Sequence, residues 1–116
     1  MTSSDASDLA LYRAKWEQRV PAELTDLVGP CTGVVALPGH VVWSGLREFD
    51  LGQPRQRMGL YRTVLAEGLH DDLCRFLNRE LLLEQWPVLR KLVSRTIRDV
   101  WESAFPELRD AAGAAA

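Results

Sequence analysis

The stretch YRTVLAEGLHDDLCRFLNRE, residues 61–80, decides the fold class of this chain. Apolar residues recur at intervals of three and four on both sides of Gly68, which is the pattern of amphipathic helices. Gly68 ends the first helix. Asp71 and Asp72 belong in the first turn of the second, where carboxylates stabilise the positive end of a helix. The stretch therefore predicts two helices joined at a glycine.

The turn between these helices has the outline of a helix-turn-helix. A DNA-reading motif of that kind presents the first residues of its second helix to the base edges. Here those residues are His70, Asp71 and Asp72, and the two carboxylates would face the phosphate backbone. Arg75 and Arg79 lie one and two turns further along. The local charge favours two core helices over a DNA-reading motif.

The N-terminal part predicts one helix and then a short second one. The first begins near Asp5, and its apolar residues follow at roughly helical spacing: Leu9, Leu11, Tyr12 and Trp16. Pro21 ends this helix or begins a short one over residues 22–28, which Gly29 terminates.

Residues 34–43 change character, because two β-branched runs flank Pro38-Gly39. This pattern favours a short β-hairpin. A Pro-Gly pair suits a type II turn, whose twist matches a two-residue hairpin poorly, so a loop and a short helix starting at Pro38 are the alternative. We expect Phe49 and Leu51 to anchor the long connection that follows to the surface of the domain.

From Pro54 onward the pattern is helical almost without a break. Pro54 suits a first helical turn. Asn78 can cap a short helix over residues 79–86. Pro87 then opens the last and longest helix, which runs to about Phe105.

Length and composition fit one domain. The chain has 116 residues, of which 47% are hydrophobic and 26% charged. We predict a mainly α fold, with five or six orthogonally packed helices over residues 6–108 and disordered ends at 1–5 and 109–116. No signal peptide and no apolar run of ~20 residues are visible, which predicts a cytoplasmic protein without membrane contact.

Charge is segregated along the chain. The net charge is −2 overall, but residues 52–98 carry net +4 and each flank carries net −3. On one helix over 87–105, four cations fall within one ~140° sector: Arg90, Lys91, Arg95 and Arg98. A solvated face balanced by the acidic ends is the plainest interpretation. Contact with an acidic protein or with nucleic-acid phosphate are the alternatives.

Residues for catalysis or metal binding are few. The only histidines are His40 and His70. His70 and Cys74 share a helix face, yet two ligands fall short of a usual zinc site. Adjacent helical carboxylates such as Asp71 and Asp72 point ~100° apart and do not converge on one ion. There is no P-loop and no dinucleotide fingerprint. We predict no catalytic residue, cofactor or metal, and therefore no enzyme.

Four tryptophans in a chain of this length suit either a core or an interface. Trp43, Trp86 and Trp101 fit core corners where an indole N–H finds a carbonyl. Trp16 lies between charged residues on the first helix, so it is an interface candidate with core packing as the alternative. The candidate interaction surface comprises Trp16, Arg55, Arg57, Arg62, Arg90, Lys91, Arg95 and Arg98.

The run RFLNRELLLEQWPVLRKLVSRTIRDVWESAFPEL, residues 75–108, resembles small helical bacterial proteins, some of which act as partners of toxins or as regulators. No motif in it carries a family assignment. The leading hypothesis is a non-catalytic protein that works by contact with another protein or with itself, as a regulator or an inhibitory, antitoxin-like partner. The alternative is a DNA-binding transcriptional regulator that uses the arginine-rich helical faces.

Overall fold

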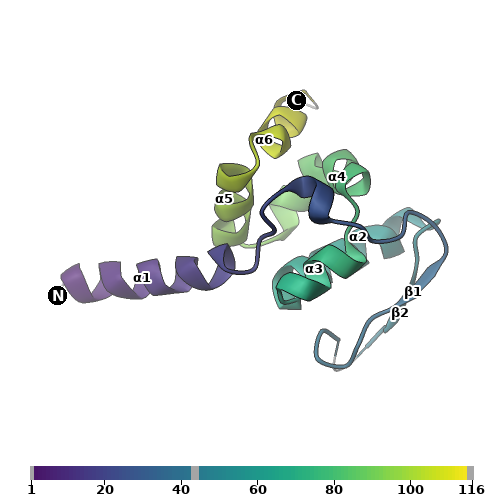
Figure 1. The fold of residues 1–116 in the computed structure, drawn as a ribbon, viewed down its shortest axis with the longest axis horizontal. Helices are drawn as coiled ribbons and strands as arrows, with labels where there is room; N and C mark the ends of the chain where they lie inside the picture. The colour runs from purple at the N-terminus through teal and green to yellow at the C-terminus, as the bar shows by residue number, and fades with distance from the viewer. Residues whose placement is uncertain (1, 43–44, 115–116) are drawn as a thin grey trace.

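The computed structural model describes residues 2–42 and 45–114, and helices dominate them (Figure 1). This confirms the mainly α fold. The α-helices are α1 (Thr2–Glu17), α2 (Pro54–Glu67), α3 (His70–Phe76), α4 (Arg79–Leu92), α5 (Arg95–Ala104) and α6 (Pro106–Ala114). A 3₁₀ turn, η1 (Leu24–Asp26), and two strands, β1 (Val34–Ala36) and β2 (Glu48–Asp50), complete the described part. No helix in it combines the length and the apolar composition needed to cross a bilayer.

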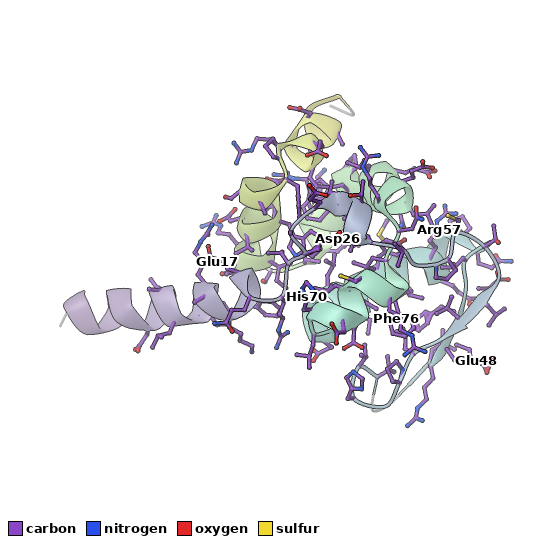
Figure 2. All side chains as sticks on the ribbon, in the orientation of Figure 1. Glu17, Asp26, Glu48, Arg57, His70 and Phe76 are labelled. Carbon is purple, nitrogen blue, oxygen red and sulfur yellow. The ribbon has the colours of Figure 1, made fainter. Side chains whose placement is uncertain are left out.

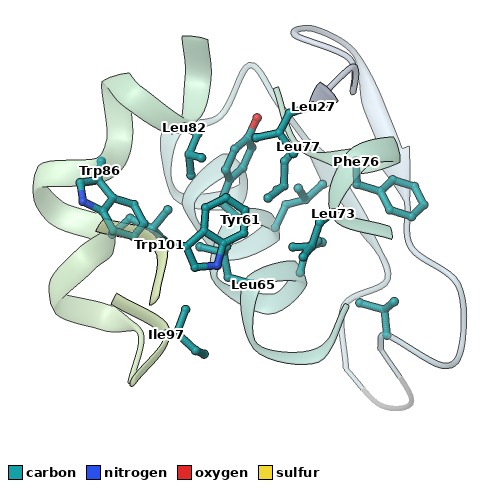
Figure 3. Close-up of a cluster of buried hydrophobic side chains, with 14 of the residues drawn as sticks. Leu27, Tyr61, Leu65, Leu73, Phe76, Leu77, Leu82, Trp86, Ile97 and Trp101 are labelled. Carbon is teal, nitrogen blue, oxygen red and sulfur yellow. The ribbon is translucent and has the colours of Figure 1, made fainter. Parts of the chain in front are cut away.

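Helices α2 and α3 are joined at Gly68, as the sequence predicts. Gly68 is required there because a Cβ at this position would stand 2.6 Å from the Val64 carbonyl oxygen. Tyr61 is fully buried, and its hydroxyl accepts the Asn78 N–H at 2.9 Å (Figure 3). Burial raises the pKa of Tyr61 to about 12. Asn78 in turn caps α4, confirming its predicted role, by accepting the N–H groups of the next turn at 3.0 and 3.3 Å.

The small sheet pairs different segments from those expected. β1 runs antiparallel to β2, with Val35 opposite Phe49, so the second strand of the hairpin predicted at residues 34–43 is misplaced. Val41 and Val42 are instead buried side by side, and both N–H groups bond to the Pro38 carbonyl in a turn. Residues 39–41 therefore form a turn rather than a strand.

The connection around β2 is anchored as predicted, because Phe49 and Leu51 are both buried. One predicted core corner, Trp43, lies outside the described residues. The other two, Trp86 and Trp101, are buried in the main cluster (Figure 3).

The predicted single helix over residues 87–105 is wrong. Pro87 lies inside α4, which ends at Leu92, and a new helix, α5, begins after Ser94. The Ser94 side chain accepts the Ile97 N–H at 3.2 Å, which is the usual action of a serine N-cap. The break separates the predicted basic face into two groups on two helices.

The two ends of the chain are more helical than expected. Helix α1 begins at Thr2 and projects from the body, meeting it near α5 (Figure 1). Helix α6 continues past the predicted boundary at residue 108 and packs against α4 and α5, with Leu108 fully buried.

Candidate interaction groove

A groove of about 670 Å³ lies at the base of α1, and we call it the α1 groove. Its walls come from the end of α1, the segment before β2, helix α2 and the junction of α4 with α5. Three of its apolar side chains are substantially exposed: Tyr12 at 44%, Leu46 at 59% and Leu92 at 44%. Arg62 and Glu67 add one charge of each sign to the lining. The lining therefore combines apolar side chains with polar and charged groups, most of them from α2.

The wall formed by α4 and α5 is held by a buried carboxylate. Glu102 accepts the Trp86 indole N–H at 2.9 Å and two Arg90 N–H groups at 2.7 and 3.3 Å. The Arg90 hydrogen bonds lower the pKa of Glu102 below its ordinary value of 4.5. An ionised carboxylate with three donors fixes the angle between the two helices, and so the shape of the groove.

Trp16 forms the floor of the groove where α1 joins the body. It is 7% exposed, so the chain packs it as core, which was the alternative to an exposed interface residue. The Lys15 ammonium and the Arg19 guanidinium lie 5.2 and 4.7 Å from its ring centre, at cation–π distance. The buried Nε1–H of Trp16 has no acceptor among the described residues. An unpaired buried donor of this kind costs ~1–3 kcal/mol.

The predicted basic outer face of the last helix is divided between α4 and α5. Arg90 is paired with Glu102, and Arg98 lies 3.8 Å from Asp99 at the surface. Arg57 donates to the Leu51 carbonyl at 3.2 Å. Arg90 and Arg57 therefore make contacts within the fold.

The other predicted cations are exposed, and none of them is in an ion pair within the described part of the chain: Arg55, Arg62, Lys91 and Arg95. Arg62 lines the α1 groove. Lys91 and Arg95 are the sequence neighbours of the lining residues Leu92 and Ser94. Of the predicted cations, the groove lining itself thus includes Arg62.

The closest approach to a catalytic pair is the contact between Cys74 and His70. Their Sγ and Nε2 atoms are 3.8 Å apart, and His70 Nδ1 lies 3.2 Å from the Arg19 carbonyl oxygen. Burial, and then the charges of Asp26 and Asp71, raise the pKa of the Cys74 thiol. A nucleophilic cysteine needs the opposite shift, because the thiolate is the reactive form. We therefore interpret the contact between Cys74 and His70 as packing within α3.

His40 makes the second histidine contact. Its Nε2 lies 2.8 Å from Asp72 Oδ2, and the same carboxylate accepts the Leu69 N–H at 3.0 Å. Asp72 is 8% exposed, so it faces the protein and joins the turn before β2 to the start of α3. Within the described residues, no three side chains of the metal-ligating kinds come together.

No family model, no curated protein and no solved structure matches this chain.

Sequence reasoning missed Leu46 and Leu92 as groove residues. Leu92 counted as core on the assumption of a continuous last helix, and the break at Ser94 leaves it at the surface. The sequence did contain one sign of the groove, the apolar stripe of Leu9, Tyr12 and Trp16 on the first helix. This stripe predicts burial along the whole helix face, but of the three only Trp16 is buried and Leu9 is 69% exposed.

Proposed function

We propose that this protein is a non-catalytic regulator or inhibitory partner that works by binding a protein chain in the α1 groove. The observation that carries this proposal is the convergence of exposed apolar side chains on one hollow. Tyr12, Leu46 and Leu92 come from three separate segments and surround the same space. Single exposed apolar residues are common, but a group gathered around a cavity marks a binding surface.

Covering the exposed apolar side chains would contribute part of the binding energy. Burying a leucine fully is worth about 1.5–3 kcal/mol, so covering the exposed parts of Leu46 and Leu92 yields a share of that for each. Association itself has a cost in free energy, so a partner must make further contacts along the groove. Trp16 is packed against the body and Glu102 joins α4 to α5, which supports a groove formed before the partner enters.

The alternative, nucleic-acid binding, is supported by Arg62 in the groove lining and by the exposed cations Lys91 and Arg95, which adjoin lining residues in the sequence. The two functions differ in their response to salt. Phosphate contacts release counterions and weaken steeply as salt rises, whereas an apolar contact does not.

A matched pair of variants tests the proposal. Leu92 and Val88 are one turn apart on α4 and similarly exposed, at 44% and 55%, but only Leu92 lines the groove. Leu92→Glu should therefore abolish binding and Val88→Glu should not. Each variant, and the wild type, is produced with an affinity tag beside an untagged copy, so that capture of a different protein or of the same chain is detected.

The proposal predicts a captured protein that the wild type and Val88→Glu retain in ~1 M salt, where charges are screened within ~3 Å. Leu92→Glu should lose it. Equal capture by the two variants would refute binding in the groove. Nucleic acid that high salt removes from the wild type would establish the alternative.

A further inference from the structure

Helix α1 carries an apolar stripe that its own chain covers only at one end. At 100° per residue, Leu9, Tyr12 and Trp16 lie within about 60° of one another around the helix axis. Trp16 is buried, Tyr12 is 44% exposed and Leu9 is 69% exposed. Figure 2 shows the N-terminal part of the helix extending away from the body, while its C-terminal part contacts α5. The stripe runs directly into the α1 groove, whose lining includes Tyr12 and Trp16.

The two ends of α1 carry charges of opposite sign. Residues 1–12 contain two acidic residues and no basic one. At the other end Arg13 pairs with Glu17 at 3.5 Å, which leaves Lys15 and Arg19 as the net charge. Both of these cations lie over the Trp16 ring. Two such helices running antiparallel place the acidic half of each beside the basic half of the other.

From these observations we infer that a second copy of this chain occupies the α1 groove, with the two α1 helices antiparallel. The inference rests on the proposed function and names the partner of that site. A two-fold axis near Tyr12 sets Asp8 of one copy opposite Trp16 of the other, since both lie four residues from Tyr12. Leu9 then covers the open end of the partner's groove. The contact is isologous, so one surface serves both copies.

The same arrangement supplies carboxylates to the cations at this end of α1. Lys15 and Arg19 lie over the Trp16 ring, and neither is in an ion pair within the described part of the chain. An Asp8 carboxylate from the second copy lies close to both cations. An acidic, apolar helix is therefore the complement of this end of the groove, and α1 itself is such a helix.

The first test measures the molar mass by sedimentation equilibrium over micromolar to submillimolar concentrations. The wild type should reach twice the chain mass of 13.0 kDa. Leu9→Glu should raise the dissociation constant by about 10- to 100-fold, because a buried leucine is lost in each copy. Leu11→Glu is the matched control. Leu11 is 71% exposed on the same helix, but about 140° away from Trp16, so its dimer should persist.

The second test uses charge to fix the helix direction. Asp8→Lys and Lys15→Glu should each weaken dimerisation about 2- to 10-fold, and the double variant should restore it, since the two positions face each other across an antiparallel pair. A parallel pair would not be restored by the double variant.

A wild type that stays monomeric throughout, or equal effects of Leu9→Glu and Leu11→Glu, would overturn this inference. It would not by itself overturn the proposed function, which is tested separately by the difference between Leu92→Glu and Val88→Glu in capturing a protein. A different protein that Leu92→Glu fails to capture, together with a monomeric wild type, would keep the groove and reject the second copy.

Discussion

Replacement of Glu102 by glutamine should destabilise this protein far more than the same change at a neighbouring acid. The Glu102 side chain is 8% exposed and accepts hydrogen bonds from Trp86 and from both arms of Arg90. Glu102→Gln keeps the shape but removes the charge that Arg90 requires. Breaking a buried ion pair from one side costs ~3–5 kcal/mol. Because the Arg90 side chain is 29% exposed, water offsets part of that loss, and we expect about 2–3 kcal/mol.

The assay is urea and thermal unfolding followed by tryptophan fluorescence. For a chain of this size 1 kcal/mol corresponds to roughly 3–6 °C in Tm, so Glu102→Gln should unfold about 6–18 °C earlier. Asp99→Asn is the control on the same helix. Its contact with Arg98 is 3.8 Å long and lies at the surface, and its loss should cost less than about 0.5 kcal/mol.

The stability difference between the wild type and Glu102→Gln should become smaller at acidic pH. The pKa of Glu102 is lowered in the folded state, so its contribution to the free energy of unfolding is complete above the ordinary carboxyl pKa of 4.5. It is lost as pH falls through the lower, folded-state pKa. The gap between wild type and Glu102→Gln should therefore narrow in acid. Equal stabilities of Glu102→Gln and Asp99→Asn at neutral pH would refute the role assigned to this carboxylate.

Three further predictions follow from single contacts. Arg90→Glu should unfold the α4–α5 junction, because it places two carboxylates together. Arg95 is exposed in the first turn of α5, so Arg95→Glu should leave Tm unchanged or slightly raised. Melting curves of the two variants test this difference. Tyr61→Phe should cost about 1–2 kcal/mol in urea, since a backbone N–H loses its acceptor, and the wild-type phenol should resist ionisation until about pH 12 in an absorbance titration. Thiol-specific labelling at neutral pH should modify exposed Cys31 well before Cys74, whose pKa is raised; equal rates would contradict the assigned burial.

The helices around Gly68 were predictable because their signals are local. The apolar periodicity and the Asn78 cap each act within one or two turns, so the sequence identifies them without knowledge of the rest of the fold. The boundary at Ser94 was missed because Pro87 is the stronger breaker in isolation. The network of Glu102 stabilises a helix that continues through that proline, and its partners lie 12 and 16 residues away.

The α1 groove was not predictable, because its walls are distant in the chain. The stripe on α1 was recognised as a face to be buried, but the sequence does not state which part of a stripe its own chain covers. Leu46 lies in a connection without periodicity, so nothing marks it as a wall residue. The cations were placed on one helix face by assuming a continuous helix, and that assumption failed at a single serine.

The measurement that tests the central claim most directly is site-specific photocrosslinking in intact cells. A photoreactive phenylalanine analogue is placed at position 92 in the α1 groove, and in a separate chain at position 88 outside it. Binding of a protein chain in the groove predicts one discrete adduct from position 92, identified by mass spectrometry, and none from position 88. Absence of an adduct at position 92, or the same adducts from both positions, would contradict the account.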